Sequence, residues 1–269
     1  MDTSGTSIRL LQLTDTHLYA DPAKRMFGVD TYQTLSDVVD AALKADPPDL
    51  VILSGDVSQD ESPESYARVH EVLRRIRVPI YYIPGNHDLP RVMSQEFTPA
   101  RPPFKEERSI AVGNWLLVLL DSTIEGQVGG ALSESELERL DQTLAAYPDH
   151  FSLVCLHHNP FSVGSGAFNE IGCANGDQLF AVTDKYKNVR IVLCGHVHQE
   201  FADQRNGVTL LASPSTCIQF KPMTAEFALD PLAPGYRMFL LQPDGSFQST
   251  VSRLSQLPRG LDLDRKLKY

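Results

Sequence analysis

The sequence lacks both an excess of basic residues and any long apolar run, and each absence excludes a class of protein. Its 269 residues include 24 Lys and Arg against 34 Asp and Glu, which gives a formal net charge of −10. Proteins that bind nucleic acid or anionic membranes without sequence preference use a basic face to neutralise phosphates, so neither partner is expected. The longest apolar runs, such as 115–120, are far too short to span a bilayer. We infer no obligate protein partner.

Cysteine is scarce, and its spacing is not that of a disulfide framework. The four cysteines, Cys155, Cys173, Cys194 and Cys217, are widely spaced without a C-x-x-C pair, and two lie in apolar runs. This pattern indicates buried, reduced thiols. Met1 is followed by neither a basic nor an apolar stretch, so we expect no signal peptide. Together these features predict a cytoplasmic protein.

Short apolar segments alternate with helical patterns over residues 8–194. Apolar runs rich in β-branched residues predict strands, and apolar residues at i, i+3 and i+4 spacing predict helices. The expected strands are 8–13, 50–53, 79–83, 115–120, 151–156 and 189–194. The expected helices are 35–43, 64–76, 137–144 and 178–186. Ser62 before Pro63, and Ser133 with Glu136, are capping patterns at two helix starts.

The pattern changes after the last of these strands. Segments 208–212, 236–241 and 247–251 read as antiparallel strands, with a turn signal at Asp244 and Gly245. Between residues 164 and 176 the chain is rich in glycine, and it is either a mobile connector or a substrate lid.

The chain shows no internal repeat, low-complexity tract or linker that would divide it. We therefore expect one domain over 1–269. Its motif-bearing core would cover about 8–220, and 221–269 would supply C-terminal strands and a tail.

Residue types that bind metals gather directly after five of the expected strands. Asp15 and His17 follow the first strand, and Asp56 follows the second. The other groups are Asn86, His87 and Asp88 after 79–83, His157 and His158 after 151–156, and His196 and His198 after 189–194. In an open α/β sheet the carboxyl ends of the strands border one crevice, so these side chains should meet.

The residue types suit a site with two metal ions. Imidazole suits transition metals, and a carboxylate can bridge two ions, whereas a neutral imidazole cannot. Asp56 is the natural bridge. Glycines Gly55, Gly85 and Gly195 precede three of the groups, where a chain leaving a strand must turn sharply.

These groups make the chain resemble the calcineurin-like metallophosphoesterases. The five blocks, in the family's order, are Asp15-Thr16-His17, Gly55-Asp56, Gly85-Asn86-His87-Asp88, His157-His158 and Gly195-His196-Val197-His198. The opening Asp15 to Leu18 and the later Ser213 to Cys217 are similar to class III cyclic-nucleotide phosphodiesterases of bacteria. The resemblance implies a four-layer αββα sandwich of two mixed β-sheets flanked by helices.

The resemblance also implies the ligands of two metal ions, with iron and manganese favoured. One ion would take Asp15, His17, Asp56 and His198, and the other would take Asp56, Asn86, His157 and His196. His158 is not a ligand in the family. Asn159 stands where many relatives have proline, next to the paired histidines.

The reaction implied is the hydrolysis of 3′,5′-cyclic AMP to 5′-AMP by attack of a metal-bridging hydroxide. His87 would protonate the leaving alkoxide or contact the phosphate, with Asp88 orienting its ring. The substrate would meet His17, Asp56, Asn86, His87 and His198.

Two alternatives remain open. A phosphodiesterase of glycerophosphodiesters, or of another small phosphate ester, would use the same metal residues. A non-catalytic scaffold with the same fold would be expected to have lost ligands, and here every ligand position is filled.

Overall fold

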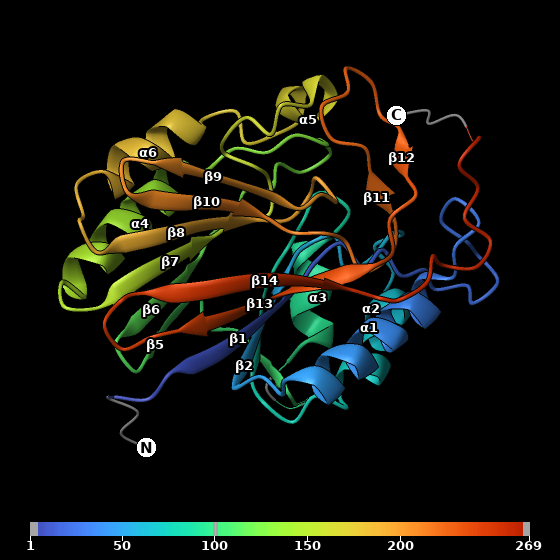
Figure 1. Cartoon of the computed structure of the whole chain (residues 1–269), viewed down its shortest axis with the longest axis horizontal. Helices are drawn as coiled ribbons and strands as arrows, with labels where there is room; N and C mark the ends of the chain where they lie inside the picture. Colours follow the sequence, from blue (N-terminus) through green and yellow to red (C-terminus); the bar gives the residue numbers. More distant parts are fainter. Residues whose placement is uncertain (1–4, 99, 101, 266–269) are drawn as a thin grey trace.

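Two six-stranded β-sheets packed face to face form the centre of the molecule (Figure 1). The computed structural model describes residues 5–98, 100 and 102–265. Helices cover the outer face of each sheet, so the layers run helix, sheet, sheet, helix. The predicted four-layer αββα fold is confirmed.

The first sheet has the strand order β14-β13-β1-β2-β3-β4. Strands β1 to β4 run parallel, β13 pairs with β1 in antiparallel, and the edge strand β14 pairs with β13 in antiparallel. The bounds are β1 (Ile8–Leu13), β2 (Leu50–Ser54), β3 (Ile80–Ile83), β4 (Phe104–Lys105), β13 (Gly235–Leu241) and β14 (Phe247–Arg253).

The second sheet has the order β5-β6-β7-β8-β10-β9, with an antiparallel strand at each edge of a parallel centre. The bounds are β5 (Ser109–Val112), β6 (Trp115–Leu119), β7 (Phe151–Cys155), β8 (Val189–Cys194), β9 (Phe201–Arg205) and β10 (Val208–Ala212). A separate pair, β11 (Gln219–Phe220) and β12 (Leu229–Asp230), lies beyond the end of this sheet.

Helices on the two outer faces belong to different parts of the chain. On the first sheet lie α1 (Thr31–Ala45), α2 (Pro63–Leu73) and α3 (Pro90–Glu96). On the second lie α4 (Glu134–Ala146) and α6 (Gly176–Thr183), whereas the short α5 (Gly166–Glu170) sits near β11 and β12.

Side-chain alternation along the strands explains how the layers form. Leu10 and Ile52 point into the core between the sheets, whereas their neighbours Leu11 and Leu53 pack under the helices. Successive strand residues face opposite sides of a sheet, so a strand covered on both faces must be apolar throughout. The carboxyl ends of β1, β2, β3, β7 and β8 are thereby held near one another at one end of the sandwich.

The antiparallel prediction for 208–212 is only half right. β10 pairs in parallel with β8 and in antiparallel with β9, an edge strand that the sequence did not reveal because its side chains are mostly exposed and polar. β13 and β14 are antiparallel as predicted, but they join the first sheet.

All four cysteines are buried and free, as their spacing predicted. Among the described residues, no helix has the length and apolar character needed to cross a membrane.

Candidate metal centre

The predicted groups meet in one buried cluster at the carboxyl ends of the strands. Asp15, His17, Asp56, His157 and His198 are all buried, and Asn86 and His87 are half-buried. Potential ligand atoms within 4.8 Å of one another form overlapping groups, and Asp56 belongs to two of them, one with His17 and one with His157.

The backbone turns sharply where it delivers these side chains. The residues with positive φ include Asp15 (54°), His17 (47°), Asp56 (48°), His196 (68°) and His198 (50°). Few residues other than glycine adopt this left-handed region, and those that do are concentrated at functional sites. The surrounding strands hold these turns in place.

Gly55 shows why a glycine stands at one of these turns. Its φ is 94°, and a Cβ there would lie 2.5 Å from His157 Nδ1 and 2.8 Å from the backbone nitrogen of Gly85. Any side chain would push the His157 ring and the Gly85 loop apart. The sequence-based role for this glycine is confirmed.

Asp56 lies between the two halves of the cluster. Its Oδ2 is 3.7 Å from His17 Nε2, and its Oδ1 is 3.3 Å from His157 Nε2. The backbone N–H of His87 donates to the same Oδ1 at 2.9 Å. One carboxylate therefore offers one oxygen to each side, as a bridging ligand must.

Further short distances join the other predicted ligands to the two sides of Asp56. His198 Nε2 lies 3.4 Å from Asp15 Oδ1 and 3.1 Å from His17 Nε2. On the other side, Asn86 Oδ1 is 3.3 Å from His157 Nε2.

Hydrogen bonds on the far sides of the rings orient the ligand nitrogens. His157 Nδ1 donates to the carbonyl of Ser54 at 2.8 Å, and His198 Nδ1 donates to the carbonyl of Ile218 at 2.9 Å. A carbonyl can only accept, so in the neutral form of each ring the lone pair is on Nε2 and faces the cluster. This arrangement is typical of metal-ligating histidine.

Two observations test whether metal ions fit this donor set. His196 Nε2 is buried without a hydrogen-bond partner, which is costly unless an ion or water satisfies it. His17 and His198 also bring their Nε2 atoms within 3.1 Å, where a cation between two lone pairs removes their repulsion. The residues fit transition-metal ions, for which imidazole and carboxylate are suitable ligands.

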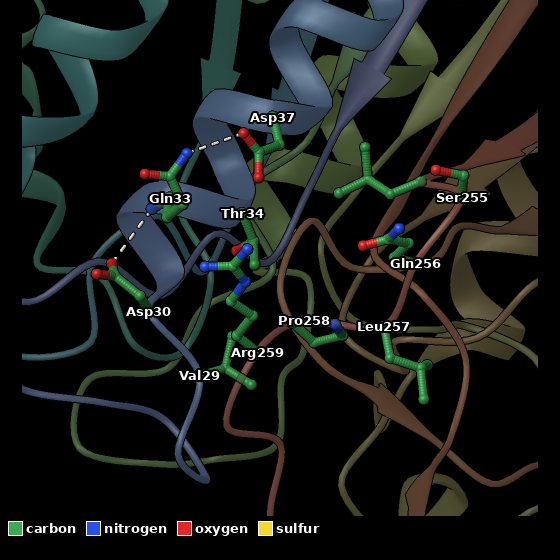
Figure 2. A pocket seen from close by; sticks show the side chains of 11 residues that line it. Val29, Asp30, Gln33, Thr34, Asp37, Ser255, Gln256, Leu257, Pro258 and Arg259 are labelled. Atoms are coloured by element: carbon green, nitrogen blue, oxygen red, sulfur yellow. Dashed lines mark hydrogen bonds between the residues drawn. The ribbon is translucent and has the colours of Figure 1, made fainter.

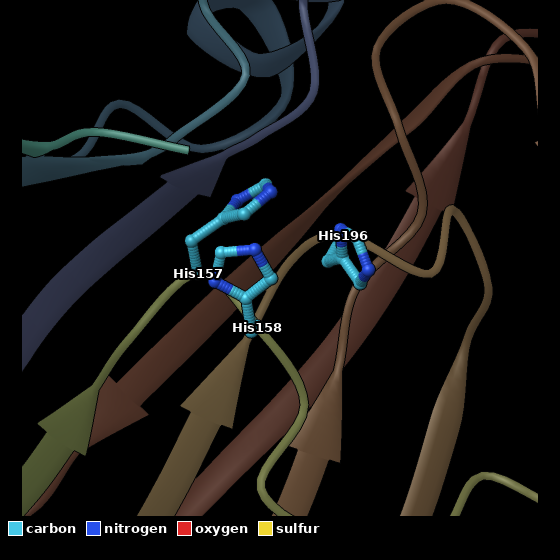
Figure 3. Close-up of side chains that lie close together, drawn as sticks. All are labelled: His157, His158 and His196. Carbon is cyan, nitrogen blue, oxygen red and sulfur yellow. The ribbon is translucent and has the colours of Figure 1, made fainter. Parts of the chain in front are cut away.

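His158 stands apart from this set although it lies close to it. Figure 3 shows its ring beside those of His157 and His196, beyond the ends of β7 and β8. Its Nε2 donates to the carbonyl of Val128 at 3.1 Å, and its Nδ1 lies 2.8 Å from Ser122 Oγ. Both ring nitrogens are engaged, so His158 supports the wall of the site instead of offering a free ligand atom.

Burial and neighbouring charge set the protonation of the cluster. Burial alone raises the pKa of Asp56, but the charges of His157 and His87 outweigh it, and the net pKa is well below the usual value. Burial lowers the pKa of His17 to about 3 and that of His196 well below its usual value. Burial also acts to lower the pKa of His157, yet Asp56 raises it to about 9. The site thus favours an ionised Asp56 and neutral rings at His17 and His196, which are the forms that bind metals, whereas His157 would release its second proton when a metal binds.

Asp88 has a different place from the one predicted for it. Its carboxylate accepts the backbone N–H groups of Val57, Ser58 and Gly85 at 2.9 to 3.1 Å and the hydroxyl of Tyr66 at 3.1 Å. The carboxylate is saturated by these donors and makes no hydrogen bond to His87. The prediction that it orients the His87 ring is wrong, because it ties the loop after β2 to the loop after β3.

Gln59 makes the contact to His87 that was assigned to Asp88. Its Nε2 lies 3.2 Å from His87 Nδ1, and its Oε1 lies 2.7 Å from His17 Nδ1. Sequence reasoning missed it because glutamine in a turn carries no periodic signal. The available clue was its position, because it lies three residues after Asp56 in the loop that carries this predicted ligand.

The serine-rich stretch after β10 supports the strand ends. Ser215 Oγ donates to the carbonyl of Asp15 at 2.7 Å, and Ser213 Oγ hydrogen-bonds Gln12. Both serines are fully buried, so they support the turn and are not exposed to a ligand.

The glycine-rich segment 164–176 packs onto the site. It contains α5, whose buried Phe168 lies edge-on to the His196 ring with centroids 5.7 Å apart. Ser165 Oγ and the backbone N–H of Gly166 both donate to the carbonyl of Thr224. The segment is a wall of the site in this conformation.

Two cavities differ in their relation to the cluster. One of about 730 Å³ is bordered by residues 85–91, which include His87, and by the loop 123–128. Another, of about 530 Å³, lies between the start of α1 and residues 254–259 (Figure 2). Its polar side chains pair with one another, as in the 2.9 Å bond from Gln33 to Asp37, and no predicted site residue lines it.

Comparison with known proteins agrees with this geometry. The profile of the family described as calcineurin-like phosphoesterase matches residues 8–200. The 3′,5′-cyclic adenosine monophosphate phosphodiesterase CpdA of Pseudomonas aeruginosa is 40% identical, over 97% of this chain and 95% of its own. CpdA of Escherichia coli K12 is 37% identical, over 92% and 90%. A dimetal phosphatase from Danio rerio has a similar fold, with a TM-score of 0.65 at 14% identity, covering 90% of this chain and 98% of its own.

Proposed function

The chain belongs to the calcineurin-like phosphoesterases, and from that membership we propose that it hydrolyses 3′,5′-cyclic AMP to 5′-AMP at a centre of two metal ions. One observation carries the proposal: five separate strand ends converge on a buried cluster in which Asp56 faces both halves. The CpdA relatives, which match nearly the whole chain, are named as cyclic AMP phosphodiesterases.

The proposed division of ligands is the one that the family resemblance implies. The first ion would be held by Asp15, His17, Asp56 and His198, and the second by Asp56, Asn86, His157 and His196. Iron and manganese are the proposed metals. When bound, such a pair generates a hydroxide nucleophile at neutral pH and neutralises charge on the phosphoryl oxygens.

His87 is the proposed catalytic residue for the leaving group or the phosphate. It borders the cavity of about 730 Å³, and its backbone N–H is bound to the shared carboxylate of Asp56. Of the side chains assigned to substrate binding, Asn86 and His87 line this cavity. The others, His17, Asp56 and His198, would meet the phosphate at the buried cluster beside Asn86 and His87. Asp88, assigned beforehand to catalysis, instead positions the loop that carries Asn86 and His87.

The proposed partners and cellular location rest on the charge and the cysteines of the chain. The formal charge of −10 disfavours a polynucleotide or anionic membrane as partner, and the four buried free cysteines suit the reducing cytoplasm. We place the whole chain in one domain.

The decisive experiment is turnover by the metal-free chain reconstituted with iron or with manganese. Cyclic AMP is the substrate, 5′-AMP is followed by chromatography, and bis-p-nitrophenyl phosphate serves as a generic diester. Turnover of cyclic AMP well above the generic rate is expected. Activity on the generic diester or a glycerophosphodiester alone would discard the cyclic-nucleotide assignment, and inactivity with two metals bound would revive the scaffold reading.

A further inference from the structure

Gln59 lies between a proposed metal ligand and the proposed catalytic histidine, and it contacts both through one amide. Its Oε1 is 2.7 Å from His17 Nδ1, and its Nε2 is 3.2 Å from His87 Nδ1. The two rings are near neighbours, with centroids 5.1 Å apart and planes at 73°.

The Gln59 side chain is well placed to hold this position. Its backbone N–H donates to the carbonyl of Leu18 at 2.8 Å, and the preceding Ser58 forms a parallel bridge with Leu18. The chain after Asp56 is thereby fastened to the chain after His17. Gln59 is half-buried, so its amide is shielded from much of the competing water.

The chemistry of His17 decides which way the amide faces. Which end is oxygen follows from the hydrogen-bond network. His17 Nε2 faces Asp56 and His198, so binding a metal requires a lone pair on Nε2 and a hydrogen on Nδ1. Only an acceptor can face that N–H. Gln59 therefore presents its oxygen to His17 and its NH2 group to His87.

The same orientation determines the tautomer of His87. The Gln59 NH2 group can only donate, so His87 Nδ1 must accept, and its hydrogen resides on Nε2. Given the proposed function, we infer that Gln59 is a positioning residue that makes His87 present an Nε2–H donor to the substrate phosphoester. A single amide thus couples the ligand tautomer of His17 to the donor tautomer of His87.

Gln59→Glu tests this coupling with almost no change of shape. The carboxylate still accepts from His17 Nδ1, but it replaces the donor facing His87 by an acceptor. His87 should then shift its hydrogen to Nδ1. Gln204→Glu, on the exposed part of β9, introduces the same charge change away from the site and is the matched control.

The first readout is spectroscopic and does not depend on turnover. Imidazole ¹⁵N shifts of the zinc-loaded chain, assigned with a His87→Ala sample, should show Nε2–H for His87 in the parent and in Gln204→Glu. They should show Nδ1–H in Gln59→Glu. A parent in which His87 carries its hydrogen on Nδ1 would overturn the inference, whether or not cyclic AMP is the substrate.

The second readout is metal content together with kinetics, on whichever diester the parent hydrolyses. Gln59→Glu should keep two metals per chain and lose ~10- to 100-fold in kcat, the usual effect of an outer-shell partner, with KM changed much less. Gln59→Met, which removes both hydrogen bonds, should lower metal affinity as well. Unchanged kcat in Gln59→Glu, with the tautomer switched, would also overturn the role. Failure of the parent to hydrolyse cyclic AMP would reject the proposed function alone.

Discussion

At the residue scale, Asp56 and His87 have different proposed roles although they are in contact. The backbone N–H of His87 donates to Asp56 Oδ1 at 2.9 Å. Asp56 faces ligand nitrogens in both halves of the cluster, whereas His87 borders the cavity. Substitution should therefore separate metal binding from turnover.

His87→Ala should retain both metals and lose most turnover, by ~10²- to 10⁴-fold, the usual contribution of a general acid or base. Asp56→Ala should lose the binuclear centre itself, because the Asp56 carboxylate directs one oxygen to His17 and the other to His157. Metal analysis by mass spectrometry alongside turnover distinguishes the two. Near-normal turnover in His87→Ala would show that its assigned role is wrong.

Asp88 acts on the loops around the site, and its substitution should be felt first in stability. Asp88→Asn puts an NH2 group against backbone donors and should cost about 1 to 3 kcal/mol of unfolding free energy. Tyr66→Phe removes one donor to Asp88 and the acceptor of the Leu89 N–H, but it leaves the three backbone bonds to Asp88 and should cost less. Urea unfolding measures both. Equal stability of Asp88→Asn and the parent would show that the Asp88 carboxylate does not stabilise the loops after β2 and β3.

At the element scale, the helix starts explain how loops near the site are anchored. The Ser62 side chain caps α2 by accepting from the Ser65 N–H, as the sequence indicated. Ser133 caps α4 in the same way, but its expected capping-box partner behaves differently. Glu136 accepts from the Asp121 N–H at 3.1 Å and pairs with Arg108 and Arg139.

Ser62→Ala should lower the unfolding free energy by ~1 kcal/mol, because one amide at the start of α2 loses its acceptor. Turnover should change little, since Ser62 contacts none of the proposed ligands. Ser62→Thr should restore most of the loss. Thermal unfolding of the three proteins is the measurement, and equal midpoints would show that water replaces the cap.

Glu136 should make stability depend on pH. Burial acts to raise its pKa, but Arg139, the Asp121 amide and Arg108 outweigh it, so the folded pKa lies below the unfolded one. Its contribution is therefore fully present above the unfolded pKa and lost as pH falls through the folded pKa. Glu136→Gln should be less stable by ~1 kcal/mol at pH 7, and the difference should shrink below about pH 4. Urea midpoints at both pH values check the sign.

At the scale of the whole molecule, the proposed ligands come from both sheets. β1, β2 and β3 of the first sheet and β7 and β8 of the second each end at the cluster. Bound metals would thus connect the two sheets and neutralise carboxylates that are buried without lysine or arginine partners among their described contacts.

Removing the metals should lower the melting temperature. Metals at ~100-fold over their dissociation constant add about 2.7 kcal/mol of stability, and each kcal/mol is worth about 2 to 4 °C in a chain of this size. A fall of roughly 5 to 10 °C on chelation, reversed by manganese, is therefore expected in calorimetry. Asp56→Ala should not respond to metal, and a parent that ignores chelation would contradict the metal centre.

Apolar periodicity and the polar groups after the strands were enough to predict most strands and helices and the cluster, and the four-layer arrangement followed from the family resemblance that those groups carry. A strand such as 115–119 is apolar throughout because it is covered on both faces, and that is a local signal. Asp15, His17 and Asp56 were recognisable as candidate metal ligands because each lies just beyond the end of a strand. These features are determined by residue type and spacing alone.

Only the tertiary structure decided which contacts the other polar residues of these loops make. Asp88 and Gln59 lie in neighbouring loops, and either could have reached His87. The difference arises because three backbone N–H groups and Tyr66 converge on the Asp88 carboxylate, leaving the Gln59 amide beside the ring. A side chain's hydrogen-bond partners are the groups that lie within about 3 Å of it in space, and the separation of residues along the sequence does not predict which groups those are.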